Sequence, residues 1–442
     1  MTTSISIDRF KETINRGKTA FLCGNGFSIN FDGDFGSIFE RLYIAHKQLI
    51  HNSSYLLNGN SSFTKKCKQN FKSVKQHLRI ASEDTLYKIF EDALIFANSV
   101  QTNQDLLDEI LENKLVNEMV FGNSQITILN QICKIGKEKG IRSVNIEYWP
   151  VLIHLYFAIR KLNPSYYAFP NSNSFINIVK IGDSVKSRVA NGEETLLEDI
   201  LLNGFTVYYR LLFSIAIFSN GKAIDLSLLT KLKNLNIGAI KDFLQDFDTL
   251  ITLNYDHILE NITQREVIHL HGEFVKGKQE YLYYQSLGLN TNYGHISFSD
   301  ILIGDYFALK NQFNIISTLN SMKTPTSKPV TYVSKKIEDI VSNNTDTFVL
   351  FGLSILNDQH ILRTIMMSFY AENTKNPKLI YCYFTEEERD IFYEQYEKCI
   401  TFSDRANEYV RNIEIEYIRT QEILDTHFHL VKSKNTTSII YA

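Results

Sequence analysis

The chain has 442 residues, of which 44% are hydrophobic and 21% charged, as in globular proteins with several domains or with one large, interrupted core. The net charge of −3 excludes the strongly basic surface of most nucleic-acid-binding proteins, so we expect no direct contact with nucleic acid. The five cysteines are far apart and form no Cys-x-x-Cys pair, which excludes a zinc ribbon and a disulfide framework. The N-terminal residues lack the features of a secretory signal, and no apolar run is long enough to span a bilayer. We therefore expect a cytoplasmic protein without a membrane partner.

The first predicted strand, residues 19–23, leads into the turn Gly24-Asn25-Gly26-Phe27-Ser28. Glycines between a strand and a helix permit a tight turn and allow backbone N–H groups to approach a phosphate at the helix N-terminus. Ser28 adds a hydroxyl donor to this turn. The third glycine of the dinucleotide-binding fingerprint is missing, so a tight turn without a ligand is an equal alternative on this motif alone.

Helical periodicity dominates between residues 36 and 245, where hardly any strand pattern occurs. The periodic segments lie near 36–50, 82–98, 104–120, 124–138, 148–162, 173–190, 194–219 and 224–246. A basic cluster at residues 64–76 is interpreted as a solvated helix face rather than a binding patch. We predict an all-helical insertion over residues 36–245, suited to oligomerisation, partner docking or gating.

From residue 246 onward, strand and helix patterns alternate. Strands are predicted at 247–253, 266–270, 347–352, 378–384 and 413–418, and helices at 255–264, 329–343, 357–371 and 386–400. This alternation predicts an α/β fold with a Rossmann-like parallel sheet and helices on both faces. Residues 273–306 are predicted to form an irregular excursion from the sheet. Residues 1–35 and 246–442 would thus form one domain that the helical insertion interrupts.

Two of these strands end in residues that suit a binding site. Asn254 follows the strand 247–253, and His271 follows the strand 266–270 after a short helix. The right-handed crossover of such a unit makes both strands parallel, so both residues lie at carboxyl ends, where open α/β sheets bind ligands. Asp256 adds a carboxylate to the same edge. His271, which precedes a glycine, suits a general base because imidazole titrates near neutral pH.

Other histidines carry weaker signals. His269 and His271 share a strand face, but no acidic or cysteine cluster in the sequence completes a metal site, so we expect no metal. His427 and His429 repeat this spacing near the C-terminus and are interpreted as ordinary edge or surface residues.

A second glycine turn, Gly352-Leu353-Ser354, follows the predicted strand 347–352. Gly352 permits close backbone approach, and Ser354 offers another hydroxyl at the same sheet edge. Asp358 is interpreted mainly as a capping charge at the start of the next helix.

Taken in chain order, these motifs resemble those of the SIR2 (sirtuin) superfamily, and most closely its NAD-cleaving effectors of prokaryotic antiphage defence. The resemblance covers residues 18–35 and 246–360, and not the helical insertion. It implies that Asn254 holds the nicotinamide ribose and a water, that His271 is the general base, and that Asp256 lies near the nicotinamide carboxamide. The implied NAD-binding residues are Gly24, Asn25, Gly26 and Ser28 at the pyrophosphate, Gly352 and Ser354 at the adenosine half, and Thr252 in the Asn254 motif.

One departure from the family narrows the expected reaction. Deacylase sirtuins carry a four-cysteine zinc module after the His-Gly pair, whereas residues 273–306 contain no cysteine. We therefore expect no zinc, and a NAD+ glycohydrolase that yields nicotinamide and ADP-ribose. A protein deacylase, an ADP-ribosyltransferase and a non-catalytic NAD- or ADP-ribose-sensing subunit are the alternatives.

The resemblance also implies how such an enzyme is used. It would be the toxic effector of an abortive-infection system, and because constant NAD loss would kill the host, its activity must be controlled. Related systems pair the effector with a HerA-type ATPase, a short Argonaute or a nucleotide-recognising subunit. We expect a partner or sensor of this kind, and an oligomer.

Overall fold

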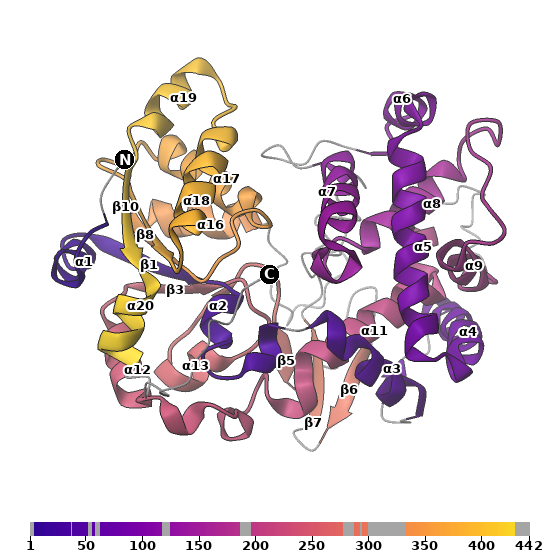
Figure 1. Ribbon diagram of the computed structural model, residues 1–442, viewed down its shortest axis with the longest axis horizontal. Helices are drawn as coiled ribbons and strands as arrows, with labels where there is room; N and C mark the ends of the chain where they lie inside the picture. The colour runs from indigo at the N-terminus through magenta and orange to yellow at the C-terminus, as the bar shows by residue number, and fades with distance from the viewer. Residues whose placement is uncertain are drawn as a thin grey trace. The chain divides into compact units, whose positions relative to one another are not determined.

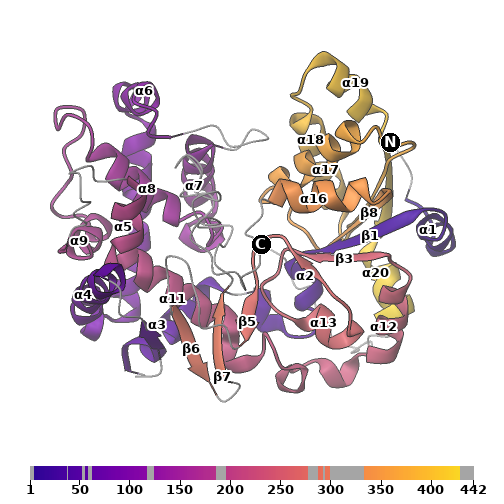
Figure 2. The ribbon, with the colours of Figure 1, turned by 180° about the vertical axis from the view of Figure 1, so that it is seen from behind.

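The computed structural model describes residues 4–36, 38–51, 55–57, 62–116, 124–185, 196–276, 287–291, 294–298 and 333–428. The chain divides into two compact units, whose elements are labelled in Figure 1 and seen from behind in Figure 2. Unit 1 consists of Met1–Ser37, Asn220–Glu273 and Thr331–Ala442, and unit 2 of Ile38–Ser219 and Phe274–Val330.

A six-stranded sheet forms the centre of unit 1, and all its neighbouring strands are parallel. Its strands are β1 (Lys18–Cys23), β3 (Thr249–Thr252), β4 (Ile268–His269), β8 (Thr345–Phe351), β9 (Lys378–Tyr383) and β10 (Glu414–Arg419). The spatial order is β10-β9-β8-β1-β3-β4. Numbered along the chain within this sheet, the strands run 3-2-1-4-5-6, which is the order found in Rossmann folds. The predicted parallel α/β sheet is confirmed.

Helices cover both faces of this sheet (Figure 1). One face packs against α16 (Val333–Ser342), α17 (Gln359–Ala371), α18 (Glu386–Cys399) and α19 (Asp404–Arg411). The other packs against α1 (Ile7–Ile14), α2 (Asn25–Ser28), α12 (Ile237–Gln245), α13 (Ile258–Thr263) and α20 (Thr420–Ile423). Side chains of β1 alternate between the two cores, with Ala20 and Leu22 in the first and Phe21 and Cys23 in the second. Burial on both faces explains why this strand is a continuous apolar run in the sequence.

Unit 2 contains half of the α-helices that the structure describes, and they follow one another along the chain. They are α3 (Leu42–His51), α4 (Ser62–His77), α5 (Glu83–Gln101), α6 (Gln104–Glu112), α7 (Gln125–Lys139), α8 (Pro150–Ile159), α9 (Ser174–Ile181), α10 (Leu196–Leu202) and α11 (Gly204–Phe218). Every residue of α11 is buried, including the polar Thr206, Arg210 and Ser214. No helix among the described residues is long and apolar enough to cross a membrane.

Unit 2 also contains an antiparallel sheet of order β2-β6-β7-β5. Its strands are β2 (Tyr55–Leu57), β5 (Phe274–Lys276), β6 (Leu287–Thr291) and β7 (Gly294–Phe298). The short strand β2 lies within the region predicted to be all helical, and its partner β6 lies far away in the sequence. Residues 220–245 also group with unit 1 rather than with the helices before them, because Ile240, Phe243 and Leu244 of α12 pack on the parallel sheet.

A buried histidine in unit 2 should make its stability depend on pH. The Nδ1 atom of His46 lies 2.6 Å from the hydroxyl of Tyr208, and burial lowers the pKa of His46 to about 4 from 6.5. Between these two values the unfolded chain binds more protons than the folded one, so stability falls as the pH falls through this window. We expect the melting temperature to drop less for His46→Gln than for wild type between pH 7 and about pH 4.5. The exposed His77→Gln should behave as wild type, and equal drops for all three proteins would contradict the prediction.

Candidate functional site

The predicted site motifs follow four neighbouring strands of the unit 1 sheet. In the order β8, β1, β3 and β4, these strands lead into the segments that contain Gly352, Gly24, Asn254 and His271. The strands are parallel, so all four segments lie at the same edge of the sheet (Figure 1). The strand order reverses between β1 and β8, which is where Rossmann-like sheets open a ligand crevice.

The two glycine turns contact each other directly at this reversal. The N–H of Gly24 donates to the carbonyl of Phe351 at 3.0 Å, and the N–H of Gly26 donates to the carbonyl of Gly352 at 3.0 Å. A Cβ atom on Gly26 would lie 2.6 Å from the Cα of Gly352, which itself has a φ of +62°. Both positions therefore require glycine for backbone packing. Because these two N–H groups are already used, a phosphate at this edge must be bound by other donors.

Asn254 is held by its side-chain amide group. Its Nδ2 atom donates to the carbonyl of Gly24 at 3.0 Å and to the hydroxyl of Ser28 at 2.8 Å. These contacts use both amide hydrogens, whereas Oδ1 accepts no hydrogen bond from the described residues. The side chain thus has a fixed position at the strand end and an acceptor oxygen available to a ligand.

Ser28 and Asp256 complete this polar network. The fully buried hydroxyl of Ser28 donates to Oδ2 of Asp256 at 2.7 Å, and Oδ1 of Asp256 accepts the backbone N–H of Ile258 at 3.1 Å. Burial raises the pKa of Asp256, although these two hydrogen bonds act in the opposite direction. Asp256 therefore fixes both the start of α13 and, through Ser28, the orientation of Asn254.

Thr252 and Asn25 shape the backbone of the same edge. The Thr252 hydroxyl accepts the backbone N–H of Asn254 at 3.0 Å and donates to the carbonyl of Cys23. Asn25 is exposed, and its side chain donates to the carbonyl of Phe35 at 2.7 Å. Both residues thus stabilise the turns on which the candidate site is built.

His271 lies against a second histidine that we did not single out from the sequence. Its Nε2 atom is 3.2 Å from Nε2 of His360, near the start of α17. The two ring planes are 18° apart and their centres 5.3 Å apart. One Nε2 must therefore donate a proton to the other, which makes the pair a route for proton transfer.

The surroundings of His271 keep its ring neutral. Burial, together with His360 and the ammonium group of Lys336, lowers the pKa of His271 well below 6.5. Burial alone lowers the pKa of His360 to about 4. Lys336, on α16, donates to the backbone carbonyl of His269. A neutral imidazole in this position can accept a proton from a substrate hydroxyl or a water at physiological pH.

The segment after β8 carries two further polar residues of the predicted motif, Ser354 and Asp358. Ser354 is exposed, and its hydroxyl accepts a hydrogen bond from the Asn357 side chain at 3.3 Å. Asp358 occupies the N-cap position of α17, as predicted, but its side chain makes no capping hydrogen bond. Its carboxylate instead lies within 4.8 Å of ring nitrogens of His271 and His360.

The other histidines discussed in the sequence analysis lie in different surroundings. His427 stacks on Phe243 at 4.4 Å between ring centres, so it is a packing residue; His429 lies outside the described residues. His269 contacts His257 and Glu260. In the sequence, the spacing His257-x-x-Glu260 corresponds to one turn of helix and could have indicated that these two side chains are neighbours. His360 could have been noticed because it lies in the first turn of a helix that follows one of the predicted motifs.

Ser28 offers a direct test of the polar network. Ser28→Ala removes the donor to Asp256 and an acceptor for Asn254, so we expect it to lower stability by about 1–3 kcal/mol. The exposed Ser342→Ala is the matched control, with a melting temperature close to that of wild type. Equal melting temperatures for the two variants would show that the network does not stabilise unit 1.

Comparison of the chain with models of protein families, with curated proteins and with solved structures finds no match. The chemistry of this site is therefore inferred from its residues and their geometry.

Proposed function

We propose that this protein is a NAD+ glycohydrolase that cleaves NAD+ to nicotinamide and ADP-ribose at the carboxyl edge of the unit 1 sheet. The observation that carries the proposal is the alignment of Gly352, Gly24, Asn254 and His271 after four consecutive parallel strands of Rossmann order. Dinucleotides bind across the strand-order reversal in such sheets. The order of the motifs, which resembles that of SIR2-like enzymes, suggests NAD+ among the dinucleotides.

The proposed reaction breaks the bond between C1′ of the ribose and the nicotinamide nitrogen. The bonding electrons leave with nicotinamide, and the oxygen of a water forms the new bond to C1′. Such a step needs orientation of the ribose and exclusion of bulk water more than covalent catalysis. Oδ1 of Asn254 would accept a hydrogen bond from a ribose hydroxyl or from the attacking water.

The proton released by this water needs an acceptor. Neutral His271 would take it, and the Nε2 contact with His360 would allow the proton to move away from the ribose. Asp256 would act indirectly, by fixing Ser28 and through it Asn254. The buried carboxylate would also favour positive charge on the ribose in the transition state.

The products of the reaction test the proposal. The protein, co-expressed with the products of its neighbouring genes, is incubated with NAD+ in water enriched in 18O. We expect nicotinamide and ADP-ribose in equal amounts, with the label at the C1′ hydroxyl. Label-free ADP-ribose attached to protein would indicate an ADP-ribosyltransferase, and consumption of NAD+ only with an acyl-lysine peptide would indicate a deacylase. Tight NAD+ binding without nicotinamide release would indicate a sensing subunit.

We further propose that the enzyme is a toxic effector of antiphage defence, held inactive until a partner or sensor releases it. Unit 2 is the proposed region for oligomerisation or partner docking. In cells that carry the protein and its neighbouring genes, NAD+ should fall after phage infection and before lysis. Constant NAD+ levels in infected, protected cells would contradict this role.

A further inference from the structure

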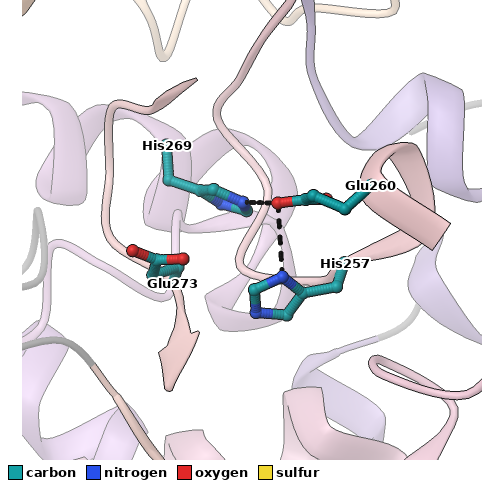
Figure 3. Close-up of side chains that lie close together, drawn as sticks. All are labelled: His257, Glu260, His269 and Glu273. Atoms are coloured by element: carbon teal, nitrogen blue, oxygen red, sulfur yellow. Dashed lines mark hydrogen bonds and ion pairs between the residues drawn. The ribbon is translucent and has the colours of Figure 1, made fainter. Parts of the chain in front are cut away.

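Four side chains with metal-ligating atoms meet in unit 1, next to the candidate NAD+ site but outside it. His257 and Glu260 come from the start of α13, His269 from the end of β4, and Glu273 from the segment after Gly272. One ligand atom from each residue lies within 4.8 Å of the others. Figure 3 shows the two imidazoles and two carboxylates arranged around a common space.

The hydrogen bonds of His269 fix the position of its ring. Its Nε2 atom is 2.5 Å from Oε1 of Glu260, and its Nδ1 atom is 2.8 Å from the backbone carbonyl of Asn254. The residue is only 4% exposed, so both ring nitrogens face protein oxygen atoms rather than solvent.

A metal ion would take the place of the direct hydrogen bond between His269 and Glu260. Bound to Nε2, it would leave the Nδ1–H of His269 donating to the carbonyl of Asn254. Metal-binding histidines commonly donate their second N–H to a backbone carbonyl in this way, which fixes both the tautomer and the ring orientation.

Glu260 is also well placed to coordinate a metal ion. Ring nitrogens of His257 and His269 both lie next to its Oε1 atom, so the carboxylate is at the centre of the group. Oε1 lies 3.2 Å from Nδ1 of His257, while Oε2 is buried and has no hydrogen-bond partner among the described residues. A buried carboxylate oxygen without a partner is costly, and coordination would relieve that cost.

We propose that His257, Glu260, His269 and Glu273 bind one divalent transition-metal ion, with zinc the best fit to this set of two imidazoles and two carboxylates. The ion would connect α13 to the end of β4 and to the segment that follows. It would therefore stabilise the region that carries Asn254 and His271. The sequence suggested no metal because the ligands come from three separate elements.

The neighbouring group of His271, Asp358 and His360 is a poorer candidate for the ion. The ring centres of the two histidines are 5.3 Å apart and their Nε2 atoms 3.2 Å apart. These two distances differ by 2.1 Å, which is about the sum of the distances from each ring centre to its own Nε2 atom. The two Nε2 atoms therefore lie almost on the line between the ring centres and point at each other. This geometry suits a hydrogen bond, because lone pairs that point at each other do not converge on one ion.

Titration of the full-length, untagged protein with Zn2+ after treatment with a chelator tests the proposal. We expect one equivalent of Zn2+ to bind with micromolar or tighter affinity and to raise the melting temperature. His257→Ala and Glu273→Gln should each weaken binding at least about tenfold. The exposed His77→Ala and Glu266→Gln are matched controls and should bind Zn2+ as wild type does.

Two further measurements assign the site. X-ray absorption of the zinc-loaded protein should show nitrogen and oxygen ligands, including two imidazoles, and no sulfur. His360→Gln should retain Zn2+ binding. The proposal is overturned if wild type binds no Zn2+, if His257→Ala and Glu273→Gln bind it unchanged, or if His360→Gln loses it. None of these readouts uses NAD+, so the result is independent of the proposed hydrolase activity.

Discussion

Asn254→Ala and His271→Ala are each expected to lower the rate of nicotinamide release from NAD+ by at least about a hundredfold. Asn254→Ala removes an acceptor whose position is fixed by hydrogen bonds to Gly24 and Ser28. His271→Ala removes a neutral imidazole at the next strand end and interrupts its contact with His360. The rates are measured by chromatography of NAD+, nicotinamide and ADP-ribose with the activated protein.

Both substitutions also disturb buried contacts, so the controls must separate folding from chemistry. Asn412→Ala and His77→Ala replace exposed residues of the same types and should retain the wild-type rate. Melting temperatures and the tightness of NAD+ binding identify variants that have lost their fold rather than their chemistry. If folded Asn254→Ala and His271→Ala still release nicotinamide at the wild-type rate, the proposed active site is wrong.

The parallel sheet could be predicted because short, local sequence patterns specify its strands and helices. The strands β1, β8 and β9 are apolar runs bounded by turns, and a strand followed by a helix and another strand has essentially one handedness. This was enough to place Asn254 and His271 at one sheet edge. The register supports the placement, because Thr252 pairs with His269 and each candidate residue lies two positions further along.

Side-chain partners were harder to predict because they depend on how separate elements meet. His360 follows His271 by 89 residues, yet their Nε2 atoms are in contact. Glu260 and His269 are closer in sequence, but the turn between α13 and β4 decides that they face each other. The strand β2 pairs with β6, which lies beyond the whole helical region, so no local pattern could reveal its partner.

The glycines of the two turns show how one pattern supports two physical explanations. In the sequence, Gly24-x-Gly26 suggests a backbone that approaches a phosphate. In the structure, Gly24 and Gly26 contact the turn of Gly352, and their N–H groups bond to that turn. Close packing of two neighbouring turns is therefore sufficient to require glycine. It also positions the two turns on either side of the strand-order reversal, where the proposed NAD+ site lies.

Gly26→Ala is consequently expected to destabilise the protein by about 2–4 kcal/mol and to abolish NAD+ binding. The new Cβ atom would lie 2.6 Å from the Cα of Gly352 and 3.1 Å from its carbonyl oxygen, and these are backbone atoms that cannot rotate away. Relief requires the turns after β1 and β8 to separate, which breaks the hydrogen bond between Gly26 and Gly352. Thermal unfolding and NAD+ titration of the full-length protein measure the two effects.

Alanine substitutions at two other glycines distinguish the effect of steric overlap from that of backbone strain. A Cβ atom on Gly33 meets nothing within 4 Å, so Gly33→Ala should be nearly neutral. Gly140 is equally open but has a φ of +83°, so Gly140→Ala should cost about 1 kcal/mol from conformation alone. Gly26→Ala should be the most destabilising of the three, because only there does the added methyl group meet another backbone. A melting temperature for Gly26→Ala within about 1 °C of that for Gly33→Ala would mean that the two turns do not pack as described. The need for glycine in the two turns would then have to come from a bound ligand rather than from the packing of one turn against the other.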